Sequence, residues 1–134
     1  MLWKVQPTYY HYREFSIEVS KTEGGAAWSA SLVASSEEQP CRLEGRLSSE
    51  EWNQFLSGFQ KAGGWQWREL GPGEEPQPTD QPYYTLDIPD WGSQRVYGLP
   101  TERHVEFANF MDRGFVGRAE SLLDKECAHR RPGP

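Results

Sequence analysis

The stretch EFSIEVSKTEGGAAWSASLVAS, residues 14–35, decides the fold class of this chain. Apolar and polar residues alternate over residues 15–19, which is the period of a strand that covers a core with one face. Gly24 and Gly25 supply the positive φ angles of a tight hairpin, and the alternation resumes over residues 28–34. We therefore expect two antiparallel strands joined by a short turn.

A third strand and a capped helix follow this hairpin. Residues 41–47 alternate in the same way, and Ser48 with Glu51 three residues later forms a capping box, in which each side chain bonds the other residue's backbone N–H. Gly63 and Gly64 end the helix. The spacing i, i+3, i+4, i+7 predicts one buried helical face made of Trp52, Phe55, Leu56 and Phe59. The helix should lie across the three strands.

The second half of the chain repeats the plan of strands before a helix. Residues 65–70 suggest a short extended segment, residues 83–88 and 93–99 predict a second hairpin, and Thr101 is a plausible N-cap. The apolar face of the second helix contains His104, Phe107, Ala108, Met111, Phe115, Ala119 and Leu122. Gly114 and Gly117 weaken that helix, so we expect a bend or a break there.

The order βββ-α-ββ-α favours an α+β fold over a parallel one, because strands are grouped before helices and joined by short links. We expect an antiparallel sheet of about five strands with two amphipathic helices packed on one face. Residues 1–125 should form a single domain, and residues 126–134 a flexible C-terminal tail. Residues 71–82 contain four prolines and two glycines and predict an exposed loop, either an inert insertion or a binding loop.

Charge and hydropathy exclude several partners and locations. The formal net charge of −6 opposes attraction to nucleic acid and to anionic membranes, and it mildly favours a basic protein partner. The N-terminus lacks the apolar run of a secretory signal, and no eighteen consecutive residues are apolar. We therefore expect a cytoplasmic protein that contacts neither nucleic acid nor membrane.

The two cysteines, Cys41 and Cys127, are too few for a zinc site or a dense disulfide framework. We expect free thiols in a cytoplasmic protein, whereas export would allow the two cysteines to form a bridge.

Motifs for chemistry are absent from the sequence. It contains no His-Glu-x-x-His, no Gly-x-Gly-x-x-Gly, no Walker loop and no Gly-x-Ser-x-Gly, so we expect no metal, no cofactor and no catalytic residues. The second hairpin could bring together Asp87, Asp90 and Glu102, but with twenty acidic residues a solvated surface explains these carboxylates better than an acid/base pair. His104 fits a partly buried structural histidine better than a general base.

The candidate binding residues are aromatic and acidic side chains that flank the proline-rich loop and the following turn. They are Trp65, Trp67, Asp80, Tyr83, Tyr84, Asp90 and Trp91. Exposed Trp and Tyr rings supply rigid contact area for a protein partner, and flat rings also stack on sugars. The leading hypothesis is a non-catalytic protein-binding domain, such as an inhibitor, an immunity-type antitoxin or a complex subunit, present as a monomer or homodimer. The alternatives are a small-molecule or carbohydrate-binding protein and an enzyme without known motifs.

Overall fold

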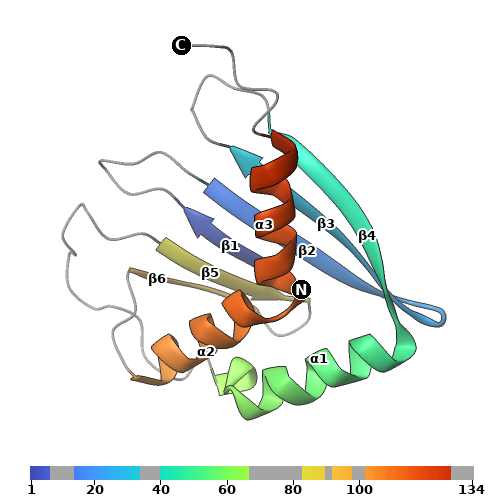
Figure 1. The fold of residues 1–134 in the computed structure, drawn as a ribbon. Helices are drawn as coiled ribbons and strands as arrows, with labels where there is room; N and C mark the ends of the chain where they lie inside the picture. Colours follow the sequence, from blue (N-terminus) through green and yellow to red (C-terminus); the bar gives the residue numbers. More distant parts are fainter. Residues whose placement is uncertain (7–13, 34–39, 67–82, 90–91, 98–101, 128–134) are drawn as a thin grey trace.

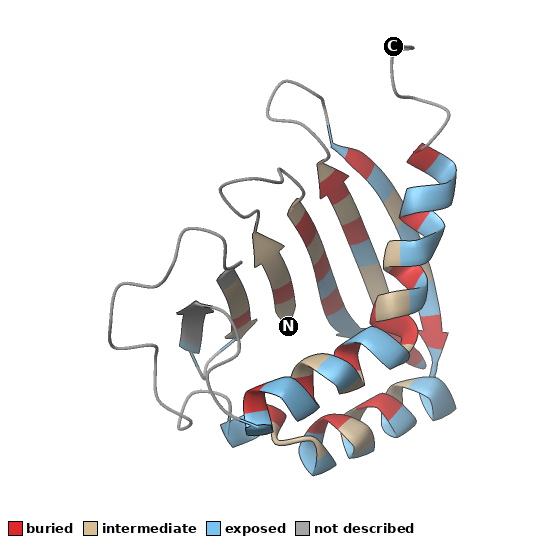
Figure 2. Cartoon of the chain, turned by 60° about the vertical axis from the view of Figure 1, so that its left-hand side comes forward, coloured by how far each residue is buried: buried red, intermediate tan, exposed pale blue. Residues whose placement is uncertain are grey.

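The computed structural model describes residues 1–6, 14–33, 40–66, 83–89, 92–97 and 102–127, with only the main chain for residues 83 and 93–97. These residues form a six-stranded antiparallel sheet with three helices on one face (Figures 1 and 2). The elements are β1 (Leu2–Gln6), β2 (Glu14–Thr22), β3 (Gly25–Val33), β4 (Cys41–Ser48), α1 (Ser49–Lys61), β5 (Tyr83–Ile88), β6 (Gly92–Tyr97), α2 (Glu102–Arg113) and α3 (Phe115–Cys127). The predicted α+β class is confirmed.

The strand count exceeds the prediction because β1 was missed. The strand order is β4-β3-β2-β1-β5-β6, so β1 pairs with β2 on one side and with β5 on the other. Trp3 points into the core, with only 3% of its surface exposed, whereas its neighbour Leu2 pairs with the exposed Glu18 on the opposite face. Because Leu2 is apolar but lies on the outer face, apolar and polar residues do not alternate in this five-residue strand, and the sequence pattern does not predict it.

The expected hairpin forms from β2 and β3, and residues 34 and 35 of the predicted stretch lie outside the described residues. Ile17 and Val19 on β2 are almost fully buried and pair with Ala30 and Trp28 on β3. Gly25 has a φ of +152°, and a Cβ there would collide with the carbonyl oxygen of Leu47 on β4. The turn therefore requires glycine at this position for its backbone angle and for the close approach of β4.

The two faces of the sheet differ in character. The face beneath the helices is lined by apolar residues, and buried positions alternate with open ones along the strands (Figure 2). On the other face the hydroxyl oxygens of Ser16 and Ser31 lie 2.8 Å apart in a hydrogen bond, and the Lys4 ammonium forms an ion pair with Glu14 at 3.2 Å. This is the one-sided burial typical of an antiparallel sheet.

The capping box of α1 is confirmed. The backbone N–H of Glu51 donates to the Ser48 hydroxyl at 3.1 Å, and the backbone N–H of Ser48 donates to the Glu51 carboxylate at 3.0 Å. Hydrogen bonds to the Glu51 carboxylate, first from the Ser48 backbone N–H and then from the Ser48 side chain, lower the pKa of Glu51. The helix ends before Gly63, whose φ is +86°. Gly64–Gln66 then form a 3₁₀ turn, so the extended segment expected from residue 65 is wrong there; residues 67–70 lie outside the described ranges.

The predicted second helix is interrupted at Gly114 and forms two helices, α2 and α3. In α3 the predicted core residues Phe115 and Ala119 are buried, but Leu122, also expected in the core, is 48% exposed, and its neighbour Leu123 is fully buried instead. A Cβ on Gly117 would strike the carbonyl oxygen of Asp112, so glycine permits the close approach of α3 to the end of α2. The helix α3 continues to Cys127, past the expected start of the tail at residue 126, and residues 128–134 lie outside the described part.

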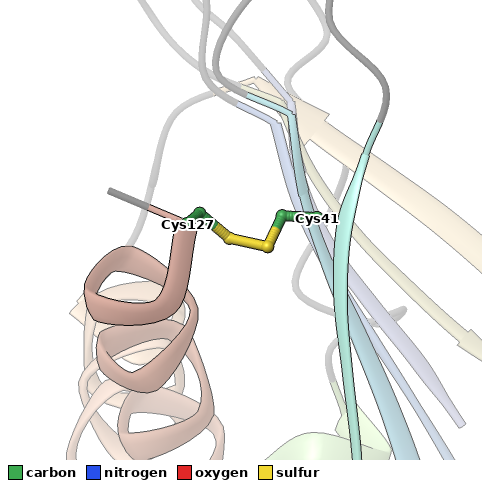
Figure 3. Close-up of a disulfide and its surroundings, with 2 residues drawn as sticks. All are labelled: Cys41 and Cys127. Carbon is green, nitrogen blue, oxygen red and sulfur yellow. A yellow bond between two sulfur atoms is a disulfide. The ribbon is translucent and has the colours of Figure 1, made fainter. Parts of the chain in front are cut away.

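Cys41 and Cys127 form a disulfide, so the expectation of free thiols is wrong (Figure 3). The bridge joins the first residue of β4 to the last residue of α3, 86 positions along the chain, with the two Cα atoms 6.0 Å apart. Helix α3 packs on β3 and β4, which brings the buried cysteines together. Such long-range proximity follows from helix packing and cannot be read from cysteine spacing.

Replacing both cysteines, Cys41→Ser with Cys127→Ser, should lower the free energy of unfolding by roughly 3 to 5 kcal/mol, because the bridge closes a long loop in the unfolded chain. Urea unfolding of the oxidised protein, the reduced protein and the double variant measures this difference. The reduced protein should behave like the variant. Two alkylatable thiols in the folded protein under non-reducing conditions would contradict the assignment.

Candidate functional site

An apolar pocket of about 350 Å³ lies between α1 and one end of the sheet, and we call it the α1 pocket. Its sheet side is formed by Met1, Glu18, Val19, Ser20, Lys21, Ile88 and Pro89. Its helix side is formed by Trp52, Phe55, Leu56, Phe59 and Trp65. The volume is within the lower range of ligand pockets, and the lining is largely apolar with a few polar groups, as such sites require.

A row of aromatic rings makes the wall of the α1 pocket rigid. The Trp52 and Phe55 rings stack with centroids 5.8 Å apart, and Phe59 meets Trp65 edge to face at 5.3 Å. Phe55 also packs edge to face on Phe115 at 4.9 Å, which ties the wall to α3. Because these rings hold one another in place, the wall does not have to reorganise when a ligand binds.

Burial changes along this wall from core to surface. Phe59 is 2% exposed and Phe55 is 8% exposed, as the predicted helical face requires, whereas Trp65 is 40% exposed. Trp52 and Leu56 are only partly buried. The sequence predicted all four α1 residues as core, and the helical period contains no signal that two of them border a pocket instead.

Polar groups stand on the sheet side of the α1 pocket. The Met1 amine donates a hydrogen bond to the Val19 carbonyl oxygen at 2.8 Å, and the Val19 N–H donates to the Met1 carbonyl oxygen at 2.8 Å. Burial lowers the pKa of this amine, and the carboxylates of Glu18 and Asp87 oppose that shift. Together with Glu18 and Lys21, the Met1 amine gives the pocket a polar border with charges of both signs.

The predicted binding residues are not all brought together by the described structure. Trp65 lines the α1 pocket. Tyr84 lies instead against Trp3, with ring centroids 5.8 Å apart, and burial is the main cause of its raised pKa. Tyr83 is in β5, but its side chain is not described. Trp67, Asp80, Asp90 and Trp91 lie outside the described ranges, so their part in a common surface stays a prediction.

A second hollow, of about 550 Å³, lies along β2, β3 and β4. Its lining includes Glu18, Glu44 and Arg46, and it lacks the row of large apolar side chains that borders the α1 pocket. A polar hollow of this kind gives an apolar ligand no anchor, so the α1 pocket is the better candidate site.

Metal-holding groups and membrane-spanning helices are both absent from the described residues. Among them, no group of three or more His, Cys, Asp or Glu side chains is placed to hold a metal ion. None of the three described helices is long and apolar enough to cross a membrane. His104 has 0% of its surface exposed, and burial lowers its pKa below the ordinary 6.5, so it is neutral at pH 7.

Comparison with known proteins gave no match: no protein-family model, no curated protein and no solved structure matches this chain.

The lowered pKa of His104 predicts a pH-dependent loss of stability. As the pH falls through about 6.5, His104 takes up a proton in the unfolded chain, whereas the buried imidazole of the folded chain does not. The contribution of His104 to the free energy of unfolding is therefore complete above pH 6.5. It is lost as the pH falls from there to the lowered folded-state value. In urea unfolding, His104→Gln should lose less stability between pH 7 and pH 5 than the parent protein does. Parallel profiles for the two proteins would contradict this assignment.

Proposed function

We propose that this chain is a non-catalytic protein-binding domain, and that the α1 pocket receives an apolar side chain of the partner. The observation that carries this proposal is an apolar pocket with a rigid aromatic wall, beside which Trp65 keeps 40% of its surface exposed. Interfaces concentrate their binding energy where an anchor side chain fills such a pocket and loses contact with water.

The polar border of the pocket supports a protein partner. Glu18 and Lys21 stand beside the apolar wall, and a polar rim around an apolar centre is the usual anatomy of a protein interface. The net charge of −6 favours a basic partner surface around the anchor and disfavours nucleic acid and anionic membrane. An inhibitor, an immunity-type antitoxin or a complex subunit, as monomer or homodimer, would use such a site.

A small apolar molecule is the second candidate ligand. The volume of about 350 Å³ supports it, because pockets of small molecules begin near this size. Carbohydrate binding has weaker support, since it requires an open ring face, and in the described part of the wall only Trp65 is classed as exposed.

The disulfide bears on the compartment in which this binding takes place. Disulfides persist mainly in oxidising compartments and are rare in the cytosol. The buried bridge between Cys41 and Cys127 therefore favours an oxidising compartment over the cytoplasmic location expected from the sequence.

Leu56→Glu should abolish partner binding, because it places a carboxylate in the apolar pocket, whereas Leu122→Glu, on the exposed surface of α3, should leave binding unchanged. The experiment captures partners from the source lysate with each protein, then titrates the identified partner by calorimetry. Thermal unfolding verifies that both variants fold.

Equal binding by Leu56→Glu and the parent protein would remove the pocket from the proposal. A Trp fluorescence change with a small apolar molecule, in the absence of any captured protein, would favour the second candidate instead.

A further inference from the structure

Strand β4 lies at the margin of the sheet (Figure 1). It pairs with β3 on one side, and within the described residues no strand pairs with it on the other side. The chain passes from β4 directly into α1 at Ser49, so this end of the strand is followed by described residues. A strand with one unpaired row of N–H and C=O groups is a template for pairing with another chain.

Gly45, in the middle of β4, keeps part of its backbone exposed. It is only partly buried, and a glycine has backbone atoms alone to expose. Its helix side is covered, because a Cβ on Gly45 would strike the Trp28 ring, and its β3 side is paired with Trp28. The exposed backbone of Gly45 therefore lies toward the strand edge and the outer face.

The two faces of β4 carry different side chains. On the outer face Arg42, Glu44 and Arg46 are all exposed, and Glu44 and Arg46 border the polar hollow along β2, β3 and β4. Within the described residues, neither Glu44 nor Arg46 has an ion-pair partner. On the helix face, Leu43 and Leu47 pack with the core. A strand that pairs with this edge meets charges on one face and leucines on the other.

We propose that a second copy of this chain pairs antiparallel with β4 through its own β4, centred on Gly45, so that two sheets continue as one. In this register Glu44 lies opposite Arg46 of the second copy, and Arg46 lies opposite its Glu44. On the helix face, Leu43 lies opposite Leu47 in the same way. Main-chain hydrogen bonds give the affinity, and the contact closes as a two-fold symmetric dimer. The inference goes beyond the proposed function and does not use the α1 pocket.

The charge pattern selects this register among the symmetric ones. Charges on an edge strand usually discourage pairing, and a pairing centred on Glu44 or on Arg46 would place like charges opposite each other. A pairing centred on Leu43 matches unlike charges, but it overlaps only residues 41–45 before it reaches Pro40, which has no N–H to donate. The pairing centred on Gly45 matches unlike charges and uses residues 42–48 of the strand.

The test is sedimentation equilibrium of the full chain and of charge variants, with thermal unfolding to verify that each variant folds. The parent protein should form a concentration-dependent dimer. Glu44→Arg or Arg46→Glu alone should weaken the dimer about tenfold, because two attractive cross-strand pairs become repulsive. The double variant Glu44→Arg with Arg46→Glu restores unlike charges in both pairs and should dimerise within about threefold of the parent.

Two further variants are matched controls. Glu106→Arg makes the same change of charge on the exposed surface of α2 and should leave the dimerisation constant unchanged. Arg42→Glu changes a charge on β4 itself, but this position lies opposite Ser48 in the proposed register, so the constant should change by less than about threefold.

A parent protein that stays monomeric at about 1 mM would overturn the proposal, because that limit lies below the affinity of specific association. A dimer that Glu44→Arg does not weaken, or that the folded double variant does not restore, would also overturn it. If Arg42→Glu weakens the dimer as much as Glu44→Arg does, the register centred on Leu43 replaces the proposed one. Leu56→Glu, which tests the α1 pocket, should leave the dimer intact, so the two proposals fail separately.

Discussion

The pairing of β1 on both of its sides is the constraint on which the remaining structure depends. Strands β2 to β4 form one meander and β5 with β6 form one hairpin, and only β1 joins them into a continuous sheet. A two-stranded hairpin alone is marginal in water, so this joint supports the second half of the chain. The Trp3 ring of β1 packs edge to face on the Phe107 ring of α2, with ring centroids 5.4 Å apart, and this contact holds α2 against the sheet.

The candidate site lies at one end of the sheet, beside Met1. Because α1 returns along that end, an apolar space remains between the helix and the strands. The aromatic rings of α1 cannot close this space, since Phe55 and Phe59 are committed to contacts with Phe115 and Phe107. The same helical face therefore stabilises the core on one side and offers a binding surface on the other.

Local patterns predicted the elements well, and tertiary packing accounts for the failures. The hairpin at Gly24 and the capping box at Ser48 depend mainly on neighbours within a few residues, so local patterns were enough to predict them. The strand at Leu2–Gln6, the disulfide and the exposure of Leu122 depend on distant elements. The site was predicted only through Trp65, because periodicity shows which residues face inward and cannot show where the interior is left unfilled.

The long covalent loop closed by Cys41 and Cys127 also decides what a protease can do to this protein. A single cut at any peptide bond between the two cysteines, including one in the proline-rich residues 71–82, leaves both fragments attached through sulfur. The fragments stay at a high effective concentration, so they can reassociate instead of diffusing apart. A backbone cut between the cysteines therefore does not by itself separate the two fragments of this chain. Once the disulfide is also reduced, the fragments can diffuse apart and the fold is lost.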